Sequence, residues 1–331
     1  MSDDNTLARV SLGRTGLQTS WLGLGTAPLG GLFTEVSEAQ ADAVVERAWQ
    51  RGIRLFDTAP LYGFGMAERR LGRVLAKRPR DEFVLTTKVG RLLRTEGVRD
   101  PSNYVDGEPI FKGAPDLRPV FDFSAQGVQV SLAESRQRMG IDRIDVAFVH
   151  DPDDHYQPAR DLALPELRRL RAAGVVSGIG AGMNQSEMLA DFVRGSDVDV
   201  VLVAGRYSLL DRSAGRELLP LCRERGVAVV VGGVFNSGVL ADAGSGATYN
   251  YLPAPQALLD RVAVLRGICA DHGVPLRAAA IQFVRRNPAV NVVLVGARSP
   301  QEVDDAVAMG TFPIPDALWS DLDAEHRGVS S

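Results

Sequence analysis

Four side chains of complementary chemistry stand at or just beyond the ends of short apolar runs. Asp57, Lys88 and His150 each come directly after such a run, and Tyr62 comes five residues after Asp57. A phenol with a pKa of about 10 is a poor proton donor or acceptor at neutral pH until a nearby cation stabilises the phenolate. Lys88 would supply that cation, Asp57 would hold the ammonium in place, and His150 would orient a substrate oxygen. The set predicts proton transfer on a carbonyl/alcohol pair.

The elements that must position these residues are eight short runs rich in β-branched residues. Most are apolar nearly throughout, as in a parallel sheet covered on both faces. Segments with helical periodicity separate them, for example those that begin with Ser37 and Ser124 and end with Gly52 and Gly140. This alternation predicts a closed (β/α)8 TIM barrel, with chemistry where the strands end. The candidate strands are Trp21–Leu24, Arg54–Phe56, Phe83–Thr87, Asp145–Val149, Val175–Gly180, Val200–Val203, Val227–Val231 and Asn291–Val295.

The rest of the chain fits a single barrel domain that takes in residues 1–331. We expect Arg9–Ser20 to form a β-hairpin across the barrel bottom, because a closed sheet leaves it no strand to pair with. Two long insertions, Leu92–Phe123 and Asp242–Pro255, are rich in turn residues and are expected at the mouth. No linker interrupts the alternation, so we reject a division into two domains.

Single charged residues at strand ends often only satisfy loop backbone groups, and four together make that alternative less favourable. A metal site in the segment His150–His155 is a second alternative, because histidines and carboxylates on barrel loops bind metals in hydrolases. Such sites draw ligands from several strands, and no paired histidine marks the first strand here. We therefore expect no metal, with Asp153 and Asp154 capping the loop.

Composition and charge bear on the partners. With 45% hydrophobic and 24% charged residues, the chain has an ordinary globular composition. Its 37 basic and 41 acidic residues give a formal net charge of −4. This balance lacks the excess of basic residues expected of a protein that binds nucleic acid or a membrane surface through charge. The two cysteines form no disulfide framework, and the chain shows no signal-peptide pattern and no spanning apolar run. We expect a small-molecule substrate, no nucleic-acid or membrane partner and a cytoplasmic location; the oligomeric state stays open.

Longer motifs surround the four side chains. They are Leu12-Gly13-Arg14-Thr15-Gly16-Leu17, Gly23-Leu24-Gly25-Thr26, Asp57-Thr58-Ala59-x-x-Tyr62-Gly63, Thr87-Lys88 and Val295-Gly296-Ala297-Arg298-Ser299. In order and spacing they resemble the aldo-keto reductases, NAD(P)-dependent oxidoreductases on a (β/α)8 barrel. The resemblance implies that Tyr62 is the general acid/base, that Lys88 and Asp57 tune it, and that His150 positions the substrate oxygen. Hydride would move to or from the nicotinamide.

A second set of motifs lies mainly in the second half of the chain. These are Asp122–Ser124, His150–His155, Gly182–Gln185, Ala204–Asp211, Gly232–Gly238 and Ala247–Tyr251. Together they resemble the branch that contains the D-threo-aldose 1-dehydrogenases (L-fucose dehydrogenases) and the pyridoxal 4-dehydrogenases, which oxidise a ring hemiacetal or similar hydroxyl to a lactone. The resemblance implies aldose oxidation, with pyridoxal oxidation or general aldehyde and ketone reduction as alternatives. A non-catalytic nucleotide-binding barrel is an alternative of another class, and the intact set of four counts against it.

The sequence has no Rossmann Gly-x-Gly-x-x-Gly motif, since Met183 stands in place of the third glycine after Gly178 and Gly180. The resemblance implies a dinucleotide extended over the barrel mouth, with Asn184 at the carboxamide, a glycine-rich loop at the pyrophosphate and a helix N-terminus near the adenosine. The implied cofactor residues are Gly25, Thr26, Asp57, Asn184, Phe235, Ser237, Gly238, Gly296, Arg298, Ser299, Glu302 and Asp305.

Several positions depart from the family pattern. Met183, Ala204 and Gly232 stand where many members have Ser, Gln and an aromatic residue that stacks on the nicotinamide. Glu302 stands where NADP-preferring members often have Arg or Gln. A carboxylate there would repel a 2′-phosphate and accept a hydrogen bond from a 2′-hydroxyl, whereas Arg298 could pair with a phosphate. We expect NAD as the preferred cofactor, with NADP possible.

Aromatic side chains on the expected mouth loops would suit a pocket that stacks on a sugar or pyridine ring. The alternative is that several of them only pack loops onto helix ends. The predicted pocket residues are Phe33, Phe64, Phe123, His155 and Tyr251.

Overall fold

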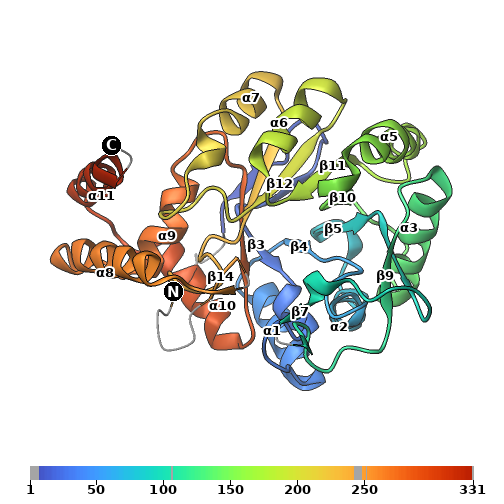
Figure 1. The fold of residues 1–331 in the computed structure, drawn as a ribbon, viewed down its shortest axis with the longest axis horizontal. Helices are drawn as coiled ribbons and strands as arrows, with labels where there is room; N and C mark the ends of the chain where they lie inside the picture. The colour runs from blue at the N-terminus through green and yellow to red at the C-terminus, as the bar shows by residue number, and fades with distance from the viewer. Residues whose placement is uncertain (1–6, 106, 242–247, 251, 330–331) are drawn as a thin grey trace.

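A closed barrel of eight parallel strands forms the centre of the computed structural model, which describes residues 7–105, 107–241, 248–250 and 252–329 (Figure 1). The strands follow chain order around the ring, and the last, β16, is hydrogen-bonded to the first, β3. The predicted barrel is confirmed. Its strands are β3 (Leu22–Gly25), β4 (Leu55–Asp57), β5 (Val84–Val89), β10 (Val146–His150), β11 (Gly178–Met183), β12 (Val200–Ala204), β13 (Ala228–Gly232) and β16 (Val292–Gly296).

Some predicted strand bounds were wrong. β4, β5 and β10 continue past their predicted ends, so Asp57, Lys88 and His150 lie within strands rather than after them. Each is paired with a residue of the neighbouring strand, because backbone pairing does not require an apolar side chain. β11 lies three residues later than predicted at both ends. The reason is that Val175 donates its backbone N–H to the end of the preceding helix instead of joining the sheet.

Helices follow the strands and surround the barrel (Figure 1). Ser37 caps α1 by accepting a hydrogen bond from the Gln40 backbone at 3.2 Å, and α3 ends at Gly140 in the left-handed conformation. The Gln40 side chain does not complete a capping box but donates to the Arg298 carbonyl at 2.7 Å, which ties α1 to the loop after β16. The main helices are α1 (Glu38–Gln50), α2 (Met66–Leu75), α3 (Ala125–Met139), α5 (Leu164–Ala172), α6 (Ser186–Gly195), α7 (Leu218–Arg225), α8 (Gln256–Asp271), α9 (Leu276–Arg285), α10 (Pro300–Gly310) and α11 (Asp316–Val329).

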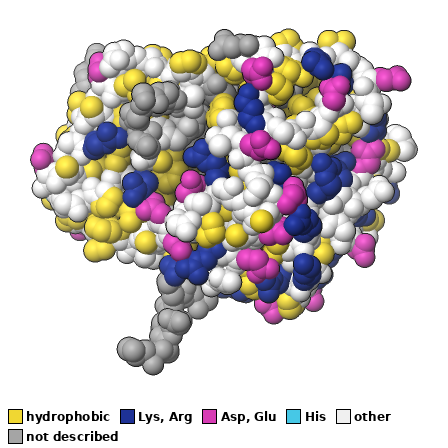
Figure 2. Space-filling view, turned by 90° about the horizontal axis from the view of Figure 1, so that it is seen from below, with side chains coloured by type: hydrophobic (Ala, Val, Ile, Leu, Met, Phe, Trp, Pro, Cys, Tyr) yellow, Lys and Arg dark blue, Asp and Glu magenta, His cyan; other side chains and the backbone are white. Residues whose placement is uncertain are grey.

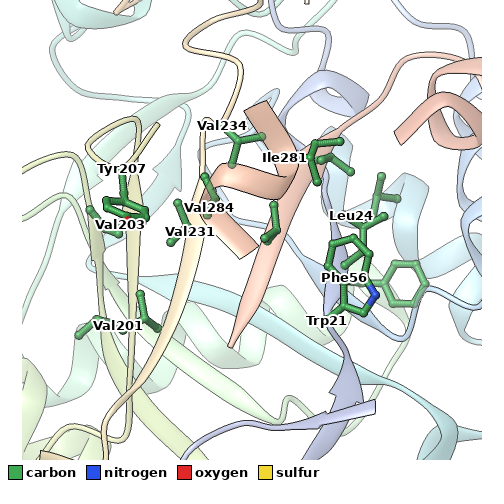
Figure 3. Packing of buried hydrophobic residues seen from close by; sticks show 14 of the residues in the cluster. Trp21, Leu24, Phe56, Val201, Val203, Tyr207, Val231, Val234, Ile281 and Val284 are labelled. Carbon is green, nitrogen blue, oxygen red and sulfur yellow. The ribbon is translucent and has the colours of Figure 1, made fainter. Parts of the chain in front are cut away.

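The main hydrophobic core lies between the barrel and the helices. Apolar side chains from β3, β4, β12, β13 and α9 fill this layer in Figure 3, among them Leu24, Phe56, Val231 and Val284. All four side chains are fully buried. Burying them removes apolar surface from water and fixes the strand ends that present the polar residues.

The predicted N-terminal hairpin, β1 (Arg9–Ser11) with β2 (Gln18–Ser20), closes the barrel bottom. Leu12 in its turn is fully buried and packs with barrel side chains that each begin a strand. Arg14 anchors the turn by an ion pair with Asp199 at 3.0 Å. The hairpin therefore seals the interior at the end opposite the mouth. The strand-initiating residues around Leu12 are Leu55, Val84, Val146, Val200, Ala228 and Val292.

Both insertions form small antiparallel pairs. In the first, β6 (Arg91–Arg94) pairs with β9 (Arg118–Phe121), and β7 (Tyr104–Val105) pairs with β8 (Glu108–Pro109). In the second, β14 (Thr248–Tyr249) pairs with β15 (Leu252–Pro253), while residues 242–247 and 251 lie outside those described.

Basic and acidic side chains are interspersed on the face shown in Figure 2. Ion pairs such as that of Arg47 with Asp304 join neighbouring helices at 2.8 Å. In the part of the chain that the structure describes, no helix has the length and apolar character needed to cross a membrane.

We predict that Leu12→Ala lowers the free energy of unfolding by about 2–5 kcal/mol, because it leaves a cavity under the barrel. Urea unfolding measures the loss. Leu17→Ala in the same hairpin is the control, since Leu17 is only partly buried against this cluster. A loss for Leu12→Ala no larger than that for Leu17→Ala would contradict the role of the hairpin as a plug.

Candidate active site

A buried ion pair lies at the mouth end of the barrel. Nζ of Lys88 on β5 is 2.7 Å from Oδ2 of Asp57 on β4, and neither side chain is more than 4% exposed. Oδ1 of Asp57 accepts a 2.6 Å hydrogen bond from the Thr86 hydroxyl, and Lys88 donates to the Thr58 carbonyl at 3.0 Å. Both carboxylate oxygens and two of the three ammonium protons thus have partners, which fixes the pair in position.

Tyr62, in the loop after β4, lies against this pair. Nζ of Lys88 is 4.7 Å from the centroid of the Tyr62 ring. Burial lowers the pKa of Lys88, but the Asp57 carboxylate and the Tyr62 oxygen more than offset this, so the pKa lies above its ordinary value. Lys88 is therefore cationic at neutral pH. A fixed cation beside a phenol favours its ionised form, which is the chemistry expected from the sequence.

His150 also lies next to Tyr62. The two rings are edge to face, with centroids 5.8 Å apart and an interplanar angle of 89°. Burial and then the charges of Arg91 and Lys88 hold the pKa of His150 well below its ordinary value. His150 is therefore neutral at pH 7, so one ring nitrogen is protonated and can donate a hydrogen bond to a substrate oxygen.

The residues that end the strands divide the barrel mouth into two halves. Asp57, Lys88 and His150 come from β4, β5 and β10, which are consecutive around the ring. On the other side, the consecutive strands β12, β13, β16 and β3 all end in glycine or alanine. Small residues there leave backbone open to the close approach of a large ligand. These four residues are Ala204, Gly232, Gly296 and Gly25.

Polar groups suited to a dinucleotide border the open half. Thr26, directly after β3, is fully buried, and its hydroxyl has no hydrogen-bond partner among the described residues. Asn184 directly follows β11, between the two halves, and is half-buried. These are the places where the family resemblance expects cofactor contacts, and the residues present fit such a group.

The loop after β13 contains the predicted residues Phe235, Ser237 and Gly238. Asn236, Ser237 and Gly238 have φ angles of 47°, 59° and 98°, an uncommon run of left-handed residues. The Asn236 side chain donates to the Gly205 carbonyl at 3.2 Å, which joins the loops after β12 and β13. Strained backbone of this kind clusters at ligand sites, so Asn236 belongs with the candidate residues, although the sequence marked it only as part of the Gly232–Gly238 motif.

The remaining predicted cofactor residues lie at the start of α10. The Ser299 hydroxyl accepts a hydrogen bond from the Glu302 backbone at 3.2 Å, and the Glu302 carboxylate accepts one from the Arg298 backbone at 2.8 Å. Glu302 therefore places its own negative charge at the N-terminus of α10. Asp305 lies further along the helix and binds Arg277 through hydrogen bonds of 2.8 and 2.9 Å.

The predicted aromatic pocket residues fall into different environments. Phe123 and His155 are brought together, with ring centroids 5.5 Å apart, and Phe121 lies 4.4 Å from His155. Phe64 is only 4% exposed and packs in a cluster of loop side chains, so the loop-packing alternative describes it better. Phe33 is half-buried in the loop after β3, and Tyr251 lies outside the described residues.

Two charged residues near His150 were not singled out as site residues from the sequence, namely Arg91 on β6 and Asp151 after β10. Oδ2 of Asp151 is 3.4 Å from Nε2 of His150 and 3.5 Å from the Arg91 guanidinium. Their positions in the chain were the available signal. Asp151 directly follows β10, and Arg91 follows Gly90, the residue directly after β5. Within the described ranges, no cluster of three or more His, Cys, Asp or Glu is arranged to hold a metal ion.

We predict that Asp151 makes stability depend on pH. Burial raises its pKa from 3.8 to about 6, with Asp153 adding to the effect and Arg91 opposing it. Between these values the folded protein keeps a proton that the unfolded chain has lost, so the contribution of Asp151 to the free energy of unfolding falls as pH rises through this window. Urea unfolding of wild type and Asp151→Asn at several pH values should show a difference that declines across the window. A flat or rising difference would refute the assignment.

Comparisons with known proteins identify the family. The model described as the aldo/keto reductase family matches residues 21–326. A D-threo-aldose 1-dehydrogenase of Pseudomonas sp is 44% identical over 94% of this chain and 95% of the relative. A pyridoxal 4-dehydrogenase of Microbacterium luteolum is 42% identical over 95% of this chain and 96% of the relative, and an L-galactose dehydrogenase of Arabidopsis thaliana is 30% identical over 91% and 87%.

Solved structures show the same fold. An aldo-keto reductase of Bacillus halodurans superposes with a TM-score of 0.74 at 24% identity, over 96% of both chains. A glycerol dehydrogenase of Gluconobacter oxydans gives 0.74 at 21% identity, over 98% of this chain and 95% of the other. The fold, the family match and the relatives lead to one conclusion: this chain belongs to the aldo/keto reductase family of oxidoreductases, which use nicotinamide cofactors.

Proposed function

We propose that this chain is an NAD-dependent dehydrogenase that oxidises the anomeric hydroxyl of an aldose to a lactone. The observation that carries the proposal is the convergence of Asp57, Lys88 and His150 on Tyr62, with a cationic lysine and a neutral histidine both close to the phenol ring. The most similar relatives described above include one named for aldose oxidation, at 44% identity.

Each side chain has a role in the oxidation. Tyr62 accepts the proton of the substrate hydroxyl, helped by the Lys88 ammonium, which stabilises the phenolate beforehand. Asp57 keeps that ammonium in place. His150 donates a hydrogen bond to the same substrate oxygen and so fixes its distance from Tyr62. A bound nicotinamide supplies the hydride acceptor. The alcohol thus loses one proton and one hydride and becomes a carbonyl.

Pyridoxal is the second candidate substrate. It is supported by the 42% identity to a pyridoxal 4-dehydrogenase and by the aromatic cluster of Phe121, Phe123 and His155, which could stack on a pyridine ring. The same proton and hydride would leave its cyclic hemiacetal.

We propose NAD over NADP because of Glu302. Its carboxylate takes the place at the α10 N-terminus that an anionic phosphate would otherwise favour. It also lies 3.7 Å from the Arg298 guanidinium, so part of that positive charge is already neutralised within the protein. A 2′-phosphate would have to displace this contact, whereas a 2′-hydroxyl can donate to the carboxylate.

We also propose that residues 1–331 form one structural domain. The first insertion packs on the mouth loops, with a β-bridge between Leu32 and Phe111 and a ring contact between Tyr62 and Phe111.

We predict that Tyr62→Phe lowers kcat by about 10²–10⁴-fold, since the variant lacks the proton acceptor. NADH binding, followed by fluorescence, should change little. Tyr156→Phe, at a half-buried tyrosine outside the site, is the control. If Tyr62→Phe binds NADH and oxidises L-fucose as fast as wild type, the catalytic assignment is wrong.

The cofactor prediction concerns kcat/KM with NAD⁺ and NADP⁺. We expect NAD⁺ to be favoured by about tenfold or more, because placing like charges together costs several kcal/mol. Glu302→Gln keeps an acceptor oxygen without the charge and should reduce this preference by about tenfold. Asp304→Asn on the same helix, which pairs with Arg47, is the control. A tenfold advantage for NADP⁺ in wild type would overturn the proposal.

A screen of NAD⁺ reduction with L-fucose, D-arabinose, L-galactose and pyridoxal tests the substrate class. We expect the highest kcat/KM with one of the sugars. Higher turnover with pyridoxal than with every sugar would replace the leading proposal by the second candidate, and turnover of none would contradict both.

A further inference from the structure

The ion pair of Arg91 and Asp151 lies beside the reacting groups but has no part in the proton and hydride steps above. Asp151 comes from the loop after β10, and Arg91 comes from the β6–β9 hairpin of the first insertion. The Asp151 carboxylate is 3.4 Å from Nε2 of His150, the histidine assigned to the substrate oxygen. Any group next to that oxygen on a substrate would therefore come close to Asp151.

The carboxylate of Asp151 is poorly satisfied within the protein. Its contacts with the neutral His150 ring and the Arg91 guanidinium are long, at 3.4 and 3.5 Å. Its side chain is 28% exposed, so a ligand can reach it, while Arg91 is only 9% exposed. The charged groups near Asp151 are Arg91, Lys88 and Asp153. Partly buried carboxylates with such weak contacts favour further hydrogen-bond donors.

The surrounding structure holds this pair in a fixed geometry. Asp151 has a φ of 37°, and its N–H donates to the Gly182 carbonyl at 3.0 Å. A non-glycine residue in this conformation is strained, and such strain concentrates at ligand sites. The Arg91 guanidinium stacks on Phe121 at 4.8 Å, which restricts its orientation.

We propose that Asp151 and Arg91 bind the hydroxyl on the substrate carbon next to the reacting carbon. A hydroxyl is both donor and acceptor, and this pair offers one acceptor and one donor beside His150. The inference rests on the proposed aldose dehydrogenase function and adds its selectivity, because the site then selects substrates with adjacent hydroxyls. Most aldoses carry a hydroxyl at that carbon, so the pair favours a sugar over a pyridine substrate.

The test compares D-arabinose with 2-deoxy-D-ribose, which is the same sugar without its 2-hydroxyl. Wild type should prefer D-arabinose by about tenfold or more in kcat/KM, since a site built to bind a hydroxyl rejects the analogue that lacks it. Asp151→Asn should lose about tenfold or more with D-arabinose, mainly through KM, and less than about threefold with the deoxy sugar. Asp154→Asn, an exposed carboxylate of the same loop, should change neither.

Equal losses with both sugars in Asp151→Asn would overturn the inference, because Asp151 would then only position His150. Arg91→Lys keeps the charge but not the planar donor fork, and it should also reduce the preference for D-arabinose. An unchanged preference in both variants would likewise overturn it.

If wild type oxidises neither these two sugars nor L-fucose and L-galactose, the proposed function is wrong, and the inference is decided by aldehyde reduction instead. Wild type should then reduce glyceraldehyde, which carries a hydroxyl next to its carbonyl, faster than propionaldehyde. Asp151→Asn should lose that preference. The same ratio in both proteins would show that Asp151 and Arg91 do not bind the adjacent hydroxyl.

Discussion

The buried ion pair between Lys88 and Asp57 is the interaction on which the rest of the site depends. An ammonium out of water is stable only when other groups replace its hydration, and here Asp57, the Thr58 carbonyl and Tyr62 do so. Two adjacent strands bring these groups within hydrogen-bond distance. Removal of the Asp57 carboxylate would leave an uncompensated buried charge, so the geometry around Tyr62 and the stability of the mouth are linked.

The circular order of the strands explains how one barrel serves both a small substrate and a dinucleotide. β4, β5 and β10 carry the charged groups, while β12, β13, β16 and β3 end in glycine or alanine. β11 lies between them and is followed by Asn184. The charged groups and the strands that end in glycine or alanine thus lie on opposite sides of the barrel mouth. A nicotinamide ring would meet the substrate between them. The hairpin plug around Leu12 closes the other end, which makes the mouth the accessible end of the barrel.

Local periodicity was enough to predict the barrel, because each strand and helix is encoded by its own apolar pattern and capping residues. The same pattern located Asp57, Lys88 and His150, but the predicted strands ended too early. Polar residues that continue the backbone pairing of a strand cannot be told from loop residues by their hydropathy. Contacts between distant segments were not predictable in this way. Gln40 binds the Arg298 carbonyl 258 residues away, and Arg91 reaches Asp151 from a different loop.

The strained backbone conformations could not be predicted from the sequence either. Asn tolerates positive φ angles better than most residues, but Asn and Ser are also common in ordinary turns, so the composition of the loop after β13 does not specify the φ angles of Asn236 and Ser237. In the sequence, Asp151 stood out only as part of the segment His150–His155, which was weighed as a metal site and as a family motif. Its contact with Arg91 depends on where the first insertion folds back over the mouth, which the residue pattern does not specify.

The central claim is that the Lys88 cation, held by Asp57, enables proton transfer at Tyr62. The most direct measurement is the single-turnover rate of NAD⁺ reduction in wild type and Lys88→Met, with the cofactor dissociation constant measured on the same samples. The account predicts a rate lower by about 10²-fold or more and a dissociation constant changed by less than about threefold. A folded Lys88→Met variant that reduces NAD⁺ at the wild-type rate would contradict it.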